Sequence, residues 1–142
     1  MNLDDFKHFL EKFEIDKSSI STLTCNKKII ELNENLFLVN NDFKLEDNIV
    51  YTDFMIFIKL KSGIKPTKFL LDFISKKSPN KIELNEKQAL NFTYGKIPNI
   101  TKNIRNNFFY LVLNSNSPIG ILEKSNNNIS NYFNIGEYLH EN

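Results

Sequence analysis

One stretch decides how the second half of the chain folds, and it reads Leu84-Asn85-Glu86-Lys87-Gln88-Ala89-Leu90-Asn91-Phe92-Thr93-Tyr94-Gly95-Lys96. Asn85 is a residue type that caps helices, and Gln88 stands three positions later, where a capping box places an amide or a carboxylate. Gly95 readily adopts the left-handed conformation that ends helices. The stretch therefore predicts a helix over residues 85–94, entered from a short strand over 81–84.

Strands are predicted on the C-terminal side of this helix. The apolar run at 108–113 is the clearest strand of the chain, and a turn at 114–118 leads into another strand at 119–122. Gly120 lies inside that strand, where it indicates a close approach of neighbouring backbone. An asparagine loop then precedes a last strand over 132–139. Short strands with one inserted helix indicate a small β-barrel.

The N-terminal side begins with a predicted helix that Asn2 caps. Apolar residues follow with helical spacing and should form one buried stripe; they are Phe6, Phe9, Leu10 and Phe13. The pattern then changes to two short strands around the turn Asn33-Glu34-Asn35, followed by one long strand over 49–60.

A second N-terminal helix is predicted after this strand. Pro66 suits its first turn, and its apolar face should consist of Phe69, Leu70, Phe73 and Ile74. Lys76 and Lys77 stand at its C-terminal end, and Ser78-Pro79-Asn80 breaks it. The sequence thus predicts an α+β protein, with a small N-terminal α/β domain over 1–79 and a barrel domain over 80–142.

The composition is that of an ordinary globular protein. Of the 142 residues, 41% are hydrophobic and 25% are charged, and 13 phenylalanines supply aromatic area for a core, which argues against wholesale disorder. The chain contains no apolar run near the roughly 18 residues of a membrane span. Its acidic start, Met1-Asn2-Leu3-Asp4-Asp5, is unlike a signal peptide. We therefore expect a cytoplasmic protein with no membrane contact.

Residue types that carry catalysis or bind metals are sparse and scattered. The single cysteine, Cys25, excludes an internal disulfide and a cysteine-rich zinc site. The two histidines, His8 and His140, stand at opposite ends of the chain, and the four glycines are isolated from one another. We therefore expect no enzymatic activity, no metal and no cofactor.

The net charge of +1 conceals a strongly basic middle. Residues 1–58 hold 6 lysines and 11 acidic residues, whereas residues 59–105 hold 10 lysines, the only arginine and 3 acidic residues. The first segment carries −5, the second +8, and residues 106–142 carry −2. A basic segment of this kind attracts phosphate backbones, although a solvated lysine-rich surface has the same composition.

Three segments of the second half together resemble the PUA domain, the RNA-binding barrel named after pseudouridine synthases and archaeosine transglycosylases. The strand, helix and Phe-x-x-Gly-Lys corner at 84–96 resemble the opening of that domain. The strand at 108–113 and the glycine-centred strand at 118–121 resemble the pair that follows.

The C-terminal segment selects one PUA family. Its sequence Ile135-Gly136-Glu137-Tyr138-Leu139-His140 resembles the close of the large-ribosomal-subunit biogenesis factor NIP-seven, in its archaeal form. The likeness is good over 80–142, and the strand and helix predicted over 50–74 resemble part of the family's N-terminal α/β domain. The loop at 96–107 and the segment at 40–48 are shorter than in the family.

The resemblance implies a monomeric, non-catalytic RNA-binding factor, with rRNA or pre-ribosomes and ribosome assembly proteins as partners. It implies a role in rRNA processing, in the cytoplasm or, in a eukaryote, in the nucleolus. One departure concerns RNA directly: where the family is rich in lysine and arginine, this chain keeps Lys124 and has asparagines over 126–131.

Seven residues are candidates for RNA contact: Lys96, Lys102, Arg105, Lys124, Lys76, Lys77 and Tyr94. The cations suit phosphates, the planar guanidinium of Arg105 can bind one bidentately, and Tyr94 offers a stacking face. Two alternatives stay open, namely that Tyr94 packs in the core and that Arg105 pairs with an acid such as Glu123.

Two other functions are compatible with the sequence. In one, the acidic N-terminal half docks a protein partner and RNA contact is minor, so that the chain is an interaction module of an assembly or RNA-modification complex. In the other, the chain is an enzyme or the detached accessory domain of an RNA-modifying enzyme. The salt dependence of RNA binding separates the first of these from an RNA-binding factor.

Overall fold

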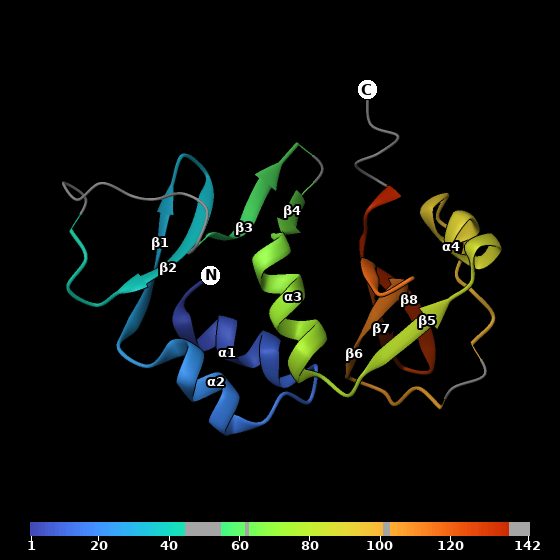
Figure 1. The fold of residues 1–142 in the computed structure, drawn as a ribbon, viewed down its shortest axis with the longest axis horizontal. Helices are drawn as coiled ribbons and strands as arrows, with labels where there is room; N and C mark the ends of the chain where they lie inside the picture. Colours follow the sequence, from blue (N-terminus) through green and yellow to red (C-terminus); the bar gives the residue numbers. More distant parts are fainter. Residues whose placement is uncertain (45–54, 62, 101–102, 137–142) are drawn as a thin grey trace. The chain divides into compact units, whose positions relative to one another are not determined.

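The computed structural model describes residues 1–44, 55–61, 63–100 and 103–136 (Figure 1). These residues form four helices and eight strands, and the strands make two separate four-stranded sheets. The predicted α+β class is confirmed. The contacts divide the chain into two compact units. Residues 1–11 and 15–77 form the first, and residues 12–14 join the chain from Ser78 onward in the second.

The first unit contains an antiparallel sheet with the strand order β1-β2-β3-β4. Its strands are β1 (Lys27–Leu32), β2 (Asn35–Asn40), β3 (Met55–Leu60) and β4 (Gly63–Pro66). The predicted hairpin is confirmed, because Asn33 and Glu34 adopt φ of 50° and 68° in the two-residue turn between β1 and β2. The part of the predicted long strand at 49–54 lies outside the described residues.

The described residues of the first unit also form three helices, which are α1 (Leu3–Glu11), α2 (Lys17–Thr24) and α3 (Lys68–Lys77). Asn2 caps α1 as predicted, since its Oδ1 accepts a hydrogen bond of 2.8 Å from the Asp5 amide. Helix α2 was not predicted from the sequence; Asp16 caps it by accepting hydrogen bonds from the amide and hydroxyl of Ser19. These two hydrogen bonds lower the pKa of Asp16.

The start of α3 differs from the prediction. Pro66 pairs with Phe57 at the end of β4, and therefore does not occupy the first helical turn. Thr67 caps the helix instead, because its Oγ1 accepts from the Leu70 amide and donates to the Met55 carbonyl. The Thr67 hydroxyl thus links the first turn of α3 to β3 through hydrogen bonds.

Phe13 was expected on the apolar stripe of the first helix, and this expectation is wrong. Phe6, Phe9 and Leu10 are the buried face of α1, but the helix ends at Glu11. Phe13 belongs to the second unit, where its ring lies 5.3 Å from that of Phe109. The tripeptide Lys12–Glu14 is held there by the Phe109 amide, which donates to the Lys12 carbonyl, and by the Ser78 hydroxyl, which donates to the Phe13 carbonyl.

The second unit is built on β5 (Lys81–Leu84), α4 (Glu86–Thr93), β6 (Phe109–Asn114), β7 (Ser117–Ser125) and β8 (Asn128–Asn134). The sheet order is β5-β6-β7-β8, with β5 parallel to β6 and the other pairs antiparallel. Helix α4 crosses between the two parallel strands and packs against both. Among the described residues, β5 and β8 are the edges of this sheet and do not pair with each other.

The last strand begins earlier than predicted. It starts at Asn128 instead of Tyr132, because Asn126 and Asn127 adopt φ of 52° and 65° in a two-residue turn. The predicted strand residues 137–139 lie outside the described part of the chain. Beneath α4, the core consists of Ile82, Leu84, Ala89, Phe92, Ile104, Tyr110, Val112 and Leu122.

Candidate nucleic-acid interface

The two ends of α4 are built as the sequence predicts. Asn85 Oδ1 accepts from the Gln88 amide at 2.8 Å, and Gln88 Oε1 accepts from the Asn85 amide at 3.0 Å, which completes a capping box. At the other end, Gly95 adopts a φ of 90° and its amide donates to the Phe92 carbonyl. The corner that follows the helix is therefore fixed by backbone hydrogen bonds.

Phe92 packs the end of α4 against β7. It is fully buried, and its ring lies directly on the backbone of β7 at Gly120. A Cβ atom at Gly120 would come within 2.5 Å of the Phe92 ring and 2.7 Å of the Phe133 carbonyl oxygen. The close approach predicted at Gly120 is confirmed, and it explains why this strand position has no side chain.

Residues at the end of β8 and just after it contact the last turn of α4. The buried Asn134 side chain donates to the Phe92 carbonyl at 2.5 Å and accepts from the Gly136 amide at 2.8 Å. A Cβ atom at Gly136 would overlap the Thr93 carbonyl group. The last turn of α4 and the end of β8 are thus in direct backbone contact.

Tyr94 lies on the surface at the end of α4. Its exposed fraction is 65%, so the alternative in which it packs in the core is wrong. Three further exposed side chains surround it in sequence, namely Leu90, Lys96 and Ile97. We call these four residues the α4 corner. It presents an aromatic face next to a cation.

Arg105 is engaged within the second unit. Its guanidinium forms an ion pair with Glu14 and lies 4.5 Å from the centroid of the Phe108 ring. Glu123, the acid named as an alternative partner, pairs with Lys12 instead, at 3.7 Å. The structural role considered for Arg105 is therefore present, with a different acid.

Lys124 and the asparagine turn hold the same segment. Lys124 Nζ donates to the Ile104 carbonyl at 2.9 Å. Asn106 and Asn127 exchange two hydrogen bonds of 3.1 Å, so the asparagine turn between β7 and β8 contacts the segment at 103–107. These contacts position the segment that follows the α4 corner.

The other candidates are dispersed. Lys76 and Lys77 are exposed at the end of α3 in the first unit. Lys102 lies outside the described residues. The structure thus places Tyr94 and Lys96 at the α4 corner. Arg105 and Lys124 instead hold the segment at 103–107, which follows this corner in the sequence.

Tyr132 is an exposed aromatic residue of the second unit that the sequence analysis did not select. Its ring lies 4.6 Å from that of Phe109 and its exposed fraction is 49%. Its partial burial, and secondarily the charge of Glu123, raise the pKa of Tyr132. The sequence predicts a strand at Tyr132. In the structure Phe133 pairs with Ile121 and Asn131 with Leu122, so Tyr132 lies at the register shift between these pairs.

Removing the Arg105 ion pair should destabilise the second unit without involving RNA. Arg105→Ala and Glu14→Gln should each lower the free energy of unfolding by about 1 kcal/mol, because the pair is partly exposed. The double variant should lose less than the sum of the two single losses, because both single variants remove the same ion pair and only Arg105→Ala also removes the contact with the Phe108 ring. Urea denaturation of the four proteins measures this, and additive losses would contradict the pair.

The described residues contain no group of three or more His, Cys, Asp or Glu side chains that could hold a metal ion. Among those residues, no helix has the length and apolar character needed to span a membrane. Comparison of the sequence with models of known protein families finds no match, and comparison with curated proteins finds none either.

Proposed function

We propose that this protein is a non-catalytic RNA-binding factor that binds rRNA during assembly of the large ribosomal subunit, with its second unit acting as a PUA-like domain. One observation carries the proposal. The segments that resemble the PUA family are distant in sequence, yet their characteristic residues meet around Phe92, which touches Gly120 and, through Asn134, Gly136. The resemblance thus corresponds to one packed corner.

The α4 corner supplies the chemistry that this function needs. RNA recognition by a small domain uses cations for phosphates and aromatic faces for unstacked bases. Lys96 and Tyr94 offer one of each, and both side chains are exposed. The fixed turn at Gly95 holds their backbone in place, so little conformational entropy is lost when a strand binds.

The remaining candidates have supporting places in this proposal. Arg105 and Lys124 position the segment at 103–107. Arg105 does so through its ion pair with Glu14, and Lys124 through its hydrogen bond to the Ile104 carbonyl. Lys102 stands in the same basic stretch of sequence and adds to its charge. Lys76 and Lys77 belong to the other unit and extend the RNA contact only if a longer RNA reaches them.

The salt dependence of binding tests the proposal. We expect the full chain to bind a fragment of large-subunit rRNA with a log-affinity that falls by roughly two to three per tenfold rise in salt, as for about three or four neutralised phosphates. Fluorescence anisotropy of the labelled fragment measures the slope. Absence of binding, or binding that does not respond to salt, would instead favour a protein-interaction module.

A further inference from the structure

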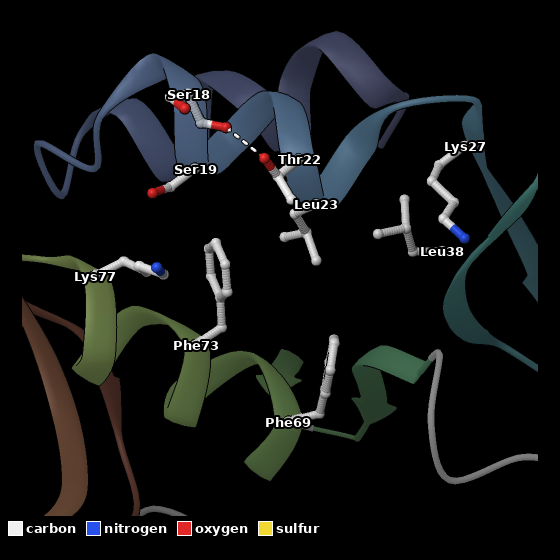
Figure 2. A pocket seen from close by; sticks show the side chains of 9 residues that line it. All are labelled: Ser18, Ser19, Thr22, Leu23, Lys27, Leu38, Phe69, Phe73 and Lys77. Carbon is white, nitrogen blue, oxygen red and sulfur yellow. Dashed lines mark hydrogen bonds between the residues drawn. The ribbon is translucent and has the colours of Figure 1, made fainter.

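The first unit contains a cavity of about 520 Å³ between α2 and α3 (Figure 2). Phe69 and Phe73 extend from α3 toward α2, from which Leu23 points back, and Leu38 of β2 contributes to the apolar wall. The sequence predicts an apolar face of Phe69, Leu70, Phe73 and Ile74 on this helix. Leu70 and Ile74 are buried as predicted, together with Leu71, whereas Phe69 is 38% exposed. Two aromatic side chains are therefore directed at an open space.

The charge of this cavity is one-sided. Among the residues that the structure describes, the lining includes two lysines, Lys27 and Lys77, and no acidic residue. Figure 2 shows the lysines at opposite ends of the apolar row. Asp16, the carboxylate whose pKa Lys77 helps to lower, is already hydrogen-bonded to Ser19 as the cap of α2. The site is thus apolar and positively charged, although the first unit as a whole contains 11 lysines and 11 acidic residues.

We propose that this cavity binds a short acidic amphipathic helix of a partner protein. Phe69, Phe73 and Lys77 follow one another at four-residue steps on α3, so they line a stripe of two helical turns, about 12 Å long. A helical peptide presents apolar anchors at the same spacing and enters grooves of this kind. Carboxylates at its two ends would face Lys27 and Lys77.

Charge complementarity selects this occupant over a neutral or a basic one. Lys27 also donates to Asn40 Oδ1, which leaves its positive charge in place at the rim. Charges at the rim of a groove contribute modestly to affinity and strongly to the choice of partner. The proposal does not depend on RNA binding at the α4 corner, because no residue of that corner is among those that line the cavity.

Two synthetic peptides test the proposal on the full chain. Both span about three helical turns with leucine at i, i+3, i+4 and i+7. One has glutamate at the other positions and the second has lysine there. Fluorescence anisotropy should show the glutamate peptide binding about three- to tenfold more tightly than the lysine peptide. Equal affinities would overturn the proposal.

Variants place the binding in the cavity. Lys77→Glu should abolish or reverse the preference for glutamate, whereas Lys68→Glu, the same change at a side chain that is 92% exposed on the same helix, should preserve it. Phe69→Ser should weaken both peptides at least about tenfold, since a buried aromatic contact is lost. Ile64→Ser, at a residue that is 51% exposed, is its matched control.

The other outcomes are also informative. If decanoate binds and neither peptide does, the cavity is a site for small organic anions and the peptide proposal is wrong. If no probe binds, or if Lys77→Glu leaves the preference unchanged, the proposal is likewise overturned. Phe69→Ser should bind the rRNA fragment as the wild type does, so failure here and failure of the RNA proposal are separate results.

Discussion

Replacing Gly136 by alanine should destabilise the second unit by about 3 kcal/mol or more, as expected when buried hydrogen-bonding groups lose their partners. The added Cβ would overlap the Thr93 carbonyl, which is backbone in the last turn of α4 and cannot rotate away. The end of β8 must therefore move. That movement breaks the bonds of Asn134 to the Phe92 carbonyl and the Gly136 amide. Urea denaturation, followed by circular dichroism, measures the loss.

Gly95→Ala is the matched control, because it separates steric overlap from backbone strain. Gly95 has a φ of 90° and open space where a Cβ would lie, so alanine there costs roughly 1 to 2 kcal/mol of left-handed strain. Gly136 does not have such a φ, so its cost is steric. If Gly136→Ala is no more destabilising than Gly95→Ala, the contact between α4 and the end of β8 is not as close as described.

The result also bears on the resemblance. Gly136 is the glycine of the Ile-Gly-Glu-Tyr-Leu sequence. A glycine is required there if no side chain fits against the end of α4. The same argument holds for Gly120, which leaves room for the Phe92 ring. Gly120 and Gly136 thus both allow close packing of β7 and the end of β8 against α4.

Local signals in the sequence were sufficient for much of the fold. The capping box of α4 and the β1–β2 turn each involve residues within four positions, and the structure forms both. Helix α2 was missed because its buried side is mixed, with Ile20 next to the buried but polar Thr24. The short strand β4 was missed because Pro66 is a residue that strands usually avoid.

Contacts between distant residues decided the rest. The spacing of Phe13 continues the stripe of α1, yet the ring packs on Phe109, which no periodicity indicates. Arg105 likewise pairs with Glu14, a residue so distant in the sequence that no local pattern indicates the contact. Tyr94 follows an amphipathic helix at its C-terminal end, where the sequence alone does not determine whether a side chain turns inward; the structure places it outside.

The double variant Tyr94→Ala, Lys96→Ala should weaken binding of the rRNA fragment by about 10- to 100-fold, if the α4 corner is the RNA site. Loss of a stacking platform costs roughly 1 to 3 kcal/mol per base, and loss of one phosphate contact adds to it. The two residues also differ in their salt response. Lys96→Ala alone should flatten the log-affinity slope by roughly 0.7 to 0.9, whereas Tyr94→Ala alone should lower affinity with the slope unchanged.

Matched variants decide whether the corner or the overall charge is responsible. Lys17→Ala with Lys61→Ala removes two charges from exposed positions of the first unit and should change affinity less than Lys96→Ala with Lys102→Ala. Leu90→Ala, at an exposed position one turn before Tyr94, controls for the loss of apolar surface. If both lysine pairs weaken binding equally and Tyr94→Ala has no effect, RNA is held by diffuse charge. The α4 corner would then not be the RNA site, because binding at that corner requires the protein to lose affinity for RNA when Tyr94 is replaced by alanine.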